Sequence, residues 1–237
     1  MTARRPPLAR LARRAAGALI VRDLKRSFRR VVWVGPPPSL PDAPVVLYAN
    51  HHGFHDGYLL WLLAGKLLRR ETTLWMEEWR RVPLFGPLGT LPFPPGDARQ
   101  RVATLRETAR RMKKENPVLV LFPEGALRPP DAGLGPFRAD LPRLARVLPA
   151  ETRWWPVALR ATWWGEDLPT ALLTAGPLYE TPDGQEPDHL RVLLTSLQAV
   201  RPDDLAAGRA HLLLDGRRAP HERFDLSALA PLFRRWT

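Results

Sequence analysis

His51 and Asp56 are the two residues whose types and spacing are best suited to catalysis. A histidine whose ring is held by a carboxylate is a common general base at neutral pH, because the carboxylate selects the tautomer and stabilises the imidazolium. The chain has no cysteine, which excludes a thiolate nucleophile, and it carries neither a Gly-x-Ser-x-Gly nor a Gly-x-x-x-x-Gly-Lys motif. A base without a protein nucleophile predicts that a substrate hydroxyl attacks directly.

A second polar turn contains Glu124, Gly125 and Arg128. An arginine beside a glycine turn suits the binding of a phosphate or another anion. Each of the two turns directly follows an apolar run, at residues 44–49 and 117–122, of the kind typical of a buried parallel strand. Because parallel strands end at the same edge of a sheet, where ligands usually bind, we expect the two turns to lie close together.

The elements around these turns alternate between strand and helix patterns. Further strands are expected at residues 31–34, 72–76, 90–93, 153–159 and 170–174, and helices at residues 57–70, 97–115, 138–148 and 187–200. This alternation predicts an α/β fold: a single domain with a mostly parallel central sheet flanked by helices, preceded by an amphipathic basic helix. We assign residues 1–30 to that helix and residues 31–237 to the domain.

The N-terminal segment carries most of the positive charge. Residues 1–30 hold ten basic side chains and one acidic side chain, a net +9 of the total +12, so the rest of the chain is near balance. Apolar residues recur in this segment at three- and four-residue steps, which predicts an amphipathic helix. Such a helix either lies in the headgroup region of an anionic membrane or packs its apolar stripe on its own domain. A nucleic-acid arm is disfavoured because the body of the chain is nearly neutral.

The sequence shows neither a membrane span nor a secretory signal. No run of about 18 apolar residues is present, and arginines interrupt the apolar positions of the N-terminal segment. We therefore expect a cytoplasmic protein that is peripheral on the inner face of the cell membrane. Its partners would include the membrane surface and no nucleic acid.

Four short blocks resemble those of the glycerolipid acyltransferases, the family that includes bacterial 1-acylglycerol-3-phosphate acyltransferase. The similar segments are Asn50–Asp56, Pro83–Gly86, Phe122–Gly125 and Trp155–Leu159. The first contains the His-x4-Asp pattern and the third is Phe-Pro-Glu-Gly, about seventy residues downstream as in that family. His-x4-Asp alone is a weak pattern, whereas the two patterns in this order and at this distance are specific. The likeness covers roughly residues 30–175.

The resemblance implies an O-acyltransferase with an α/β fold. His51 would take the proton from the acceptor hydroxyl, and Asp56 would orient the histidine ring. The oxygen would then attack the thioester of acyl-CoA or acyl-carrier protein, so the only co-substrate is that acyl donor and no cofactor is expected. The residues expected to bind substrate are Asn50, Glu124, Gly125 and Arg128. The implied partners are a lipid acceptor, the acyl donor and a membrane surface.

Two departures from the family pattern concern the acceptor. Ala126 and Leu127 stand where the family has Thr-Arg, so the arginine comes one place later, and Pro94–Pro95 replaces an arginine thought to contact the acceptor phosphate. Arg99 and Arg101 follow, but we expect their helix to place them elsewhere. A lysophosphatidate-like acceptor is the default expectation. The alternatives are another lipid alcohol, such as a glycolipid or an isoprenoid, and a non-catalytic lipid-binding module.

Two further histidines, His52 and His55, lie in the first turn. We expect His52 to point away from the cleft and His55 to form a hydrogen bond within the turn. A metal site built from the histidines of this turn and Asp56 is the alternative. The alternating histidines followed by Asp-His that metallo-hydrolases use are not present, so no metal is expected.

Overall fold

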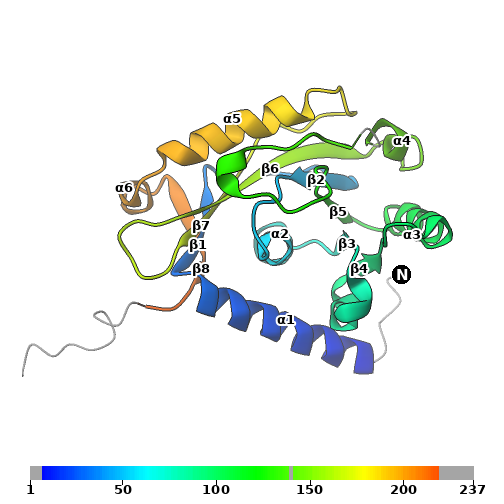
Figure 1. Cartoon of the computed structure of the whole chain (residues 1–237), viewed down its shortest axis with the longest axis horizontal. Helices are drawn as coiled ribbons and strands as arrows, with labels where there is room; N and C mark the ends of the chain where they lie inside the picture. Colours follow the sequence, from blue (N-terminus) through cyan, green and yellow to red (C-terminus); the bar gives the residue numbers. More distant parts are fainter. Residues whose placement is uncertain (1–6, 139–140, 219–237) are drawn as a thin grey trace, which may run out of the picture.

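The computed structural model describes residues 7–138 and 141–218, and within them one eight-stranded sheet forms the centre of the molecule (Figure 1). The strands are β1 (Arg30–Val34), β2 (Val45–Ala49), β3 (Thr72–Met76), β4 (Thr90–Pro92), β5 (Val118–Leu121), β6 (Arg153–Thr162), β7 (Thr170–Ala175) and β8 (Ala210–Asp215). Their order is β4-β3-β5-β2-β6-β7-β1-β8. The strands from β4 to β6 run parallel, β7 is antiparallel to β6, β1 is parallel to β7, and β8 is antiparallel to β1. The predicted α/β fold with a mostly parallel sheet is therefore confirmed.

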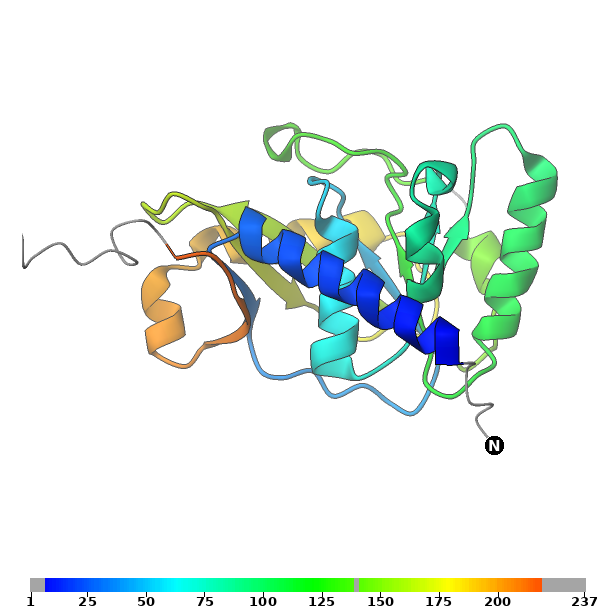
Figure 2. The ribbon, with the colours of Figure 1, turned by 90° about the horizontal axis from the view of Figure 1, so that it is seen from below.

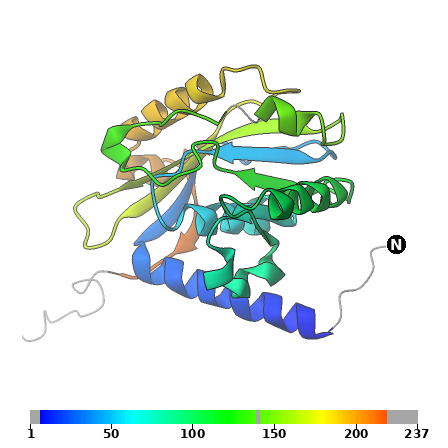
Figure 3. The ribbon, with the colours of Figure 1, turned by 45° about the vertical axis from the view of Figure 1, so that its right-hand side comes forward.

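Helices cover both faces of this sheet (Figures 1 and 3). The α-helices are α1 (Pro7–Ser27), α2 (Asp56–Leu63), α3 (Ala98–Arg111), α4 (Leu141–Ala145), α5 (Glu186–Ala199) and α6 (Pro202–Ala206), and the shorter helical turns are η1 (Ala64–Leu68), η2 (Trp79–Arg81), η3 (Pro83–Leu88) and η4 (Pro130–Ala132). Successive strand residues point to opposite faces. Accordingly, Val45 and Leu47 of β2 pack with α1 and α2, whereas Val46 and Tyr48 pack with α4 and α5.

Strands β2 and β5 lie side by side in the middle of the sheet and end together. Tyr48 of β2 is in register with Leu121 of β5, and Ala49 is in register with Val157 of β6. Every residue of β2 and β5 is buried, as expected for continuous apolar runs that are covered on both faces. The two polar turns therefore leave the sheet at the same carboxyl edge, where the sequence places them.

Helix α1 packs along the sheet rather than standing apart from it. Its buried residues Ala16, Ile20 and Leu24, together with Phe28 just after its end, follow a four-residue step and join the same core as β2. Figure 2 shows α1 crossing α2, and a Cβ built on Gly17 would lie 3.0 Å from the ring of Trp61 on α2. The interpretation of this segment as a helix that packs on its own domain thus describes its second half.

The first turns of α1 differ from the second half, because Leu8 and Leu11 are exposed. Among residues 7–138 and 141–218, no helix combines the length and the apolar composition needed to cross a membrane. Three parts of the predicted elements lie outside the described residues. They are residues 1–6 of the N-terminal helix predicted at 1–30, residues 219–237 of the domain predicted at 31–237, and residues 139–140 of the helix predicted at 138–148.

Candidate active site

The His51 ring and the Asp56 carboxylate form the predicted pair. His51 Nδ1 donates a hydrogen bond to Asp56 Oδ2 over 3.0 Å. Because Nδ1 carries the proton of this bond, Nε2 is left as the nitrogen that can accept a proton from a substrate. The His51 side chain is 22% exposed and that of Asp56 is 8% exposed. The base is thus open to a substrate while its partner is shielded from water.

The local fold fixes the Asp56 carboxylate. Asp56 is the first residue of α2, and its Oδ2 also accepts hydrogen bonds from the backbone N–H groups of His52 at 2.7 Å and Gly53 at 2.8 Å. A carboxylate at a helix N-terminus is stabilised by the helix dipole as well as by these donors. The His-x4-Asp spacing follows from this turn, because it brings the carboxylate back onto the backbone that precedes it.

Phe122, the last apolar residue before the second turn, supports the face of the His51 ring. The two ring centroids are 4.1 Å apart and the planes differ by 15°. Hence the residue after β5 supplies a flat apolar wall to the histidine in the turn after β2. The first residue of the Phe-Pro-Glu-Gly block, Phe122, therefore packs directly against the ring of the catalytic base.

Glu124 connects three segments that are distant in sequence. Its Oε1 accepts a hydrogen bond from the backbone N–H of His51 at 2.8 Å, and its Oε2 accepts one from the backbone N–H of Gly135 at 2.7 Å. The residue is 7% exposed, so both oxygens are used inside the protein. This geometry gives Glu124 a role in holding the backbone of the catalytic turn, and its predicted contact with substrate stays a prediction.

Gly125 has a backbone conformation that favours glycine. Its φ is +65°, and a Cβ built on it would lie 2.1 Å from Arg138 Nε. The guanidinium of Arg138 donates a hydrogen bond to the Gly125 carbonyl at 3.0 Å and lies 3.4 Å from Glu77 Oε1. The glycine therefore allows a close approach of an arginine that ties the second turn to the segment after β3.

Arg128 and Asn50 lie around the pair without touching its ring atoms. The Arg128 backbone N–H donates to the His51 carbonyl at 3.0 Å, and its side chain lies against Gly135. Within the described residues its guanidinium makes no ion pair, which leaves it available to an anion. Asn50 is fully buried and exchanges two hydrogen bonds with the backbone of Leu159 on β6, at 3.0 and 2.8 Å. Asn50 thus lies behind the site, where it fixes the end of β2 to β6.

Two expectations for the histidines are wrong. His52 does not point away from the cleft: it lines a cavity beside the catalytic turn. His55 does not bond within the turn, because its Nε2 lies 3.1 Å from both Asp23 Oδ2 and Ser27 Oγ of α1. These contacts join residues about thirty positions apart, so a local reading of the turn could not find them. They connect the end of α1 to the start of α2.

The expectation that α3 removes Arg101 from the end of β4 is also wrong. The Arg101 guanidinium carbon lies 4.3 Å from the centroid of the Phe93 ring, and that ring stacks on Trp75 of β3 at 4.4 Å. Arg101 Nε is buried and has no hydrogen-bond partner among the described residues. A cation therefore lies close to Pro94–Pro95 after all.

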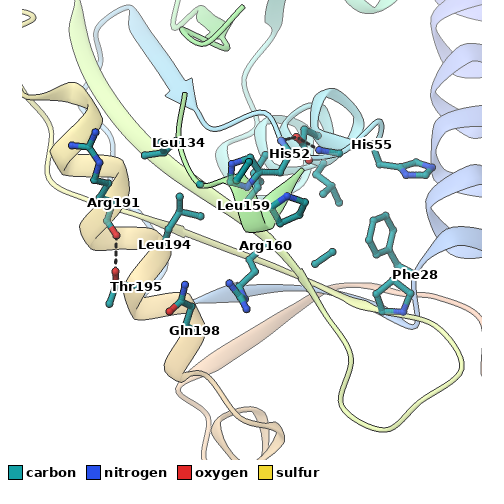
Figure 4. A pocket seen from close by; sticks show the side chains of 18 of the residues that line it. Phe28, His52, His55, Leu134, Leu159, Arg160, Arg191, Leu194, Thr195 and Gln198 are labelled. Carbon is teal, nitrogen blue, oxygen red and sulfur yellow. Dashed lines mark hydrogen bonds between the residues drawn. The ribbon is translucent and has the colours of Figure 1, made fainter. Parts of the chain in front are cut away.

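The cavity beside the turn has a volume of about 720 Å³ (Figure 4). It is lined by His52, His55 and Asp56 of the turn, by Arg160 of β6, by Leu194 of α5 and by parts of the loop at residues 130–134. A cavity of this size fits a small-molecule head group or part of a lipid. Its opening at the carboxyl edge of the sheet is where ligands of α/β folds usually bind.

One titratable group beside the pair has a shifted pKa. Burial, together with the nearby Asp23, raises the pKa of Tyr58, whose ring meets His55 edge-on at 5.8 Å. Tyr58 therefore stays protonated at neutral pH and can donate a hydrogen bond. Over the described parts of the chain, no three histidine, aspartate or glutamate side chains are grouped so that they could hold a metal ion.

Comparison with known proteins agrees with this geometry. A protein-family model described as Acyltransferase matches residues 30–160, which is more than half of the chain and contains both turns. A search of curated proteins gave no match. The matched range ends at Arg160, so in chain order it contains β1 to β5 and all but the last two residues of β6.

Proposed function

The chain belongs to the acyltransferase family of the PlsC type, and from this premise we propose that it transfers a fatty acyl group to the hydroxyl of a lysophospholipid. The acceptor would resemble 1-acylglycerol 3-phosphate, and the donor would be acyl-CoA or acyl-carrier protein. The observation that carries the proposal is the 3.0 Å contact between His51 Nδ1 and Asp56 Oδ2, which leaves Nε2 free to act as a base. The reaction would serve phospholipid biosynthesis.

The proposed step needs only the side chains of this turn. His51 Nε2 takes the proton of the acceptor hydroxyl while the oxygen of that hydroxyl attacks the thioester carbonyl. The C–O bond forms, the C–S bond breaks, and the thiolate leaves with the proton that His51 held. Asp56 stabilises the imidazolium in between and keeps Nδ1 as the donor. The acyl donor is the co-substrate, and the step uses no cofactor and no metal.

Exposed apolar side chains around the site support binding to a membrane surface. Phe54 follows β2, Leu127 follows β5 and Trp163 follows β6, and all three are more than half exposed. Because these strands are parallel, the three side chains lie at the edge that carries the site. Aromatic and leucine side chains favour the membrane interface, where a lysolipid acceptor would be found. We propose that this edge faces the inner leaflet of the cell membrane.

The first turns of α1 lie at the opposite edge. Arg13 is 3.5 Å from Glu71, which precedes β3 at its amino end, whereas Ser27 contacts His55 at the carboxyl edge. Leu8 and Leu11 precede Arg13, so these two exposed side chains form a second apolar surface, separate from the one at the carboxyl edge. Sedimentation with anionic vesicles separates the two surfaces. We expect F54S/L127S/W163S to abolish co-sedimentation, while V102S/V192S/L212S and L8S/L11S retain it. Loss only in L8S/L11S would assign binding to α1 instead.

The decisive experiment is a transfer assay with purified protein. Labelled acyl-CoA and acyl-carrier protein are each incubated with a panel of lysophospholipids, glycolipids and isoprenoid alcohols, and the acylated product is identified. We expect the lysophospholipid to be acylated. Pro94–Pro95 in place of the family arginine favours a less phosphorylated lipid alcohol as the second candidate, and acylation of such an alcohol alone would establish it. Absence of transfer to every acceptor would contradict the proposed enzyme and favour a lipid-binding module.

A further inference from the structure

The cavity beside the catalytic turn combines apolar walls with one cation that has no partner. Leu134, Leu159 and Leu194 contribute to its walls. Among the described lining residues, Asp56 is the only carboxylate, and its Oδ2 is already occupied by three N–H donors. The charge that the cavity presents is therefore positive.

Arg160 supplies that charge. It is half-buried on β6, where its backbone pairs with β7, and it lines the cavity. Within the described residues its side chain makes no hydrogen bond or ion pair. Figure 4 shows its side chain extending from β6 toward Gln198 on α5. The other arginine of the lining, Arg191, is instead bonded to Asp188 and is mostly exposed. A half-buried guanidinium without a counter-ion is well suited to a phosphate, which it can bind through two N–H groups.

His52 adds a second polar group without a partner. Its Nε2 is buried and has no hydrogen-bond partner in the part of the chain that the structure describes. A buried polar nitrogen that is left unpaired costs free energy unless a ligand or water satisfies it. His52 and Arg160 both belong to the lining of this cavity.

The position of Arg160 on β6 bears on which anion the cavity would hold. Ala49 of β2 is in register with Val157 of β6, and Asn50 bonds with Leu159, so Arg160 comes next to the start of the catalytic turn. Neighbouring strands are about 4.8 Å apart. In a glycerol phosphate the phosphate and the reacting hydroxyl are separated by only a few bonds, whereas the thioester of the donor is separated from its nearest phosphate by the whole pantetheine arm.

We propose that this cavity binds the phosphate of the acceptor, with Arg160 as its charge partner and His52 Nε2 as a second contact. The proposal rests on the proposed function, and it names Arg160 as the residue that selects a phosphorylated acceptor. Arg160 thereby takes the role of the family arginine that Pro94–Pro95 replaces in the sequence. The acceptor's hydroxyl then lies toward His51 while its phosphate lies toward α5.

The test compares R160Q, R160K and the control R106Q, which removes an exposed arginine of α3. Transfer is measured with saturating acyl-CoA to 1-acylglycerol 3-phosphate and to 1-acylglycerol, and then with varied acyl-CoA. We expect R160Q to raise the KM for the phosphorylated acceptor by about 10- to 100-fold, the effect of losing one charged hydrogen-bond pair. Its kcat, its KM for acyl-CoA and its KM for 1-acylglycerol stay as in the wild type. R160K shows a smaller rise and R106Q none.

Each other outcome overturns the proposal in a recognisable way. An unchanged KM for the phosphorylated acceptor would exclude Arg160 from its site and leave the proposed function intact. A raised KM for acyl-CoA alone would show that the cavity holds a phosphate of the donor. If the wild type transfers to no acceptor, the proposed function fails, and binding of glycerol 3-phosphate measured by calorimetry then tests the site alone. Binding by the wild type that is lost in R160Q supports the phosphate site, and equal or absent binding in both refutes it.

Discussion

The turns after β2 and β5 each carry one buried carboxylate, but the two carboxylates make different contacts. Asp56 Oδ2 accepts hydrogen bonds from the His51 ring and from two backbone N–H groups of its own turn. Glu124 accepts from the backbone N–H groups of His51 and Gly135, which belong to two other segments. The first carboxylate orients a titratable ring, and the second holds the backbone around that ring. Two acidic residues at the same sheet edge can therefore have different roles.

Substitution in the first turn is expected to have the largest effect. His51→Ala removes the base and Asp56→Asn removes the charge that orients it, so we expect each variant to lose acyl transfer by at least about 10²- to 10⁴-fold. The His51 ring lies at the surface of the site, so His51→Ala should keep a thermal midpoint close to that of the wild type. Steady-state transfer and thermal unfolding measure the two quantities. His211→Ala, at an exposed position of β8, is the matched control.

Near-normal turnover in either variant would contradict the different roles proposed for the two turns, because the His51–Asp56 pair would then not take part in the reaction. A large fall in the thermal midpoint of His51→Ala would also contradict these roles, since the His51 ring would then stabilise the fold as Glu124 does.

Substitution of Glu124 is expected to lower stability first and activity as a consequence. Glu124→Ala leaves the buried N–H of Gly135 and the half-buried N–H of His51 unpaired, each at a cost of up to about 1–3 kcal/mol. Glu124→Gln keeps one acceptor oxygen, so the loss of unfolding free energy should be smaller. Chemical denaturation measures the unfolding free energies of the two variants. Transfer assays at temperatures well below the unfolding midpoint should show a fall in kcat, because the catalytic turn is displaced.

Glu186 provides a control of the same kind on α5. Its Oε1 is bonded to the backbone N–H groups of Asp183 and Gly184, which lie within three residues of it, and it is 6% exposed. Glu186→Ala should therefore destabilise the protein without a fall in kcat. If Glu186→Ala lowered kcat as much as Glu124→Ala does, the loss would reflect general destabilisation and not the support of the catalytic turn.

The parts of the site that could be predicted from the sequence are those that local patterns determine. The apolar runs before His51 and Glu124 predict buried strands, and the rule that parallel strands end at one edge brings the two turns together. The pairing of His51 with Asp56 follows from a turn of five residues. Such features depend on neighbouring residues and on the alternation of strands and helices.

The parts that could not be predicted depend on contacts between distant segments. Gly135 belongs to a loop without a periodic pattern, and Asp23 meets His55 only because α1 packs on the sheet. Strand β8 was also missed, because it lies at the sheet edge, most of its residues are not buried, and its pairing with β1 is irregular between Val31 and Val32. An edge strand of this kind has no clear apolar alternation to reveal it.

Gly125→Ala separates backbone strain from the contact that the second turn makes. A left-handed conformation is expected to cost an alanine about 1–2 kcal/mol. Gly165, with φ +81° and no atom near a built Cβ, should lose only this amount of unfolding free energy in Gly165→Ala. Only Gly125→Ala displaces Arg138 from the Gly125 carbonyl and from Glu77, so only it should raise the KM for the acceptor, by a few-fold. Equal kinetics in the two variants would show that this contact does not affect acceptor binding.

Glu107 on α3 gives the smallest expected effect and shows what a carboxylate outside both turns contributes. Hydrogen bonds from Arg110 and Arg111 lower its pKa from 4.5 to about 2. Because the pKa is lower in the folded state, the stabilisation is complete above about pH 4.5 and is lost as the pH falls toward 2. The ion pair is partly exposed, so Glu107→Gln should cost at most about 1 kcal/mol of unfolding free energy at neutral pH and leave transfer unchanged. Urea denaturation at several pH values should show the difference between the two proteins vanish near pH 2. A difference that persists there would arise from packing, and any loss of transfer would show that carboxylates outside the two turns also act on the site.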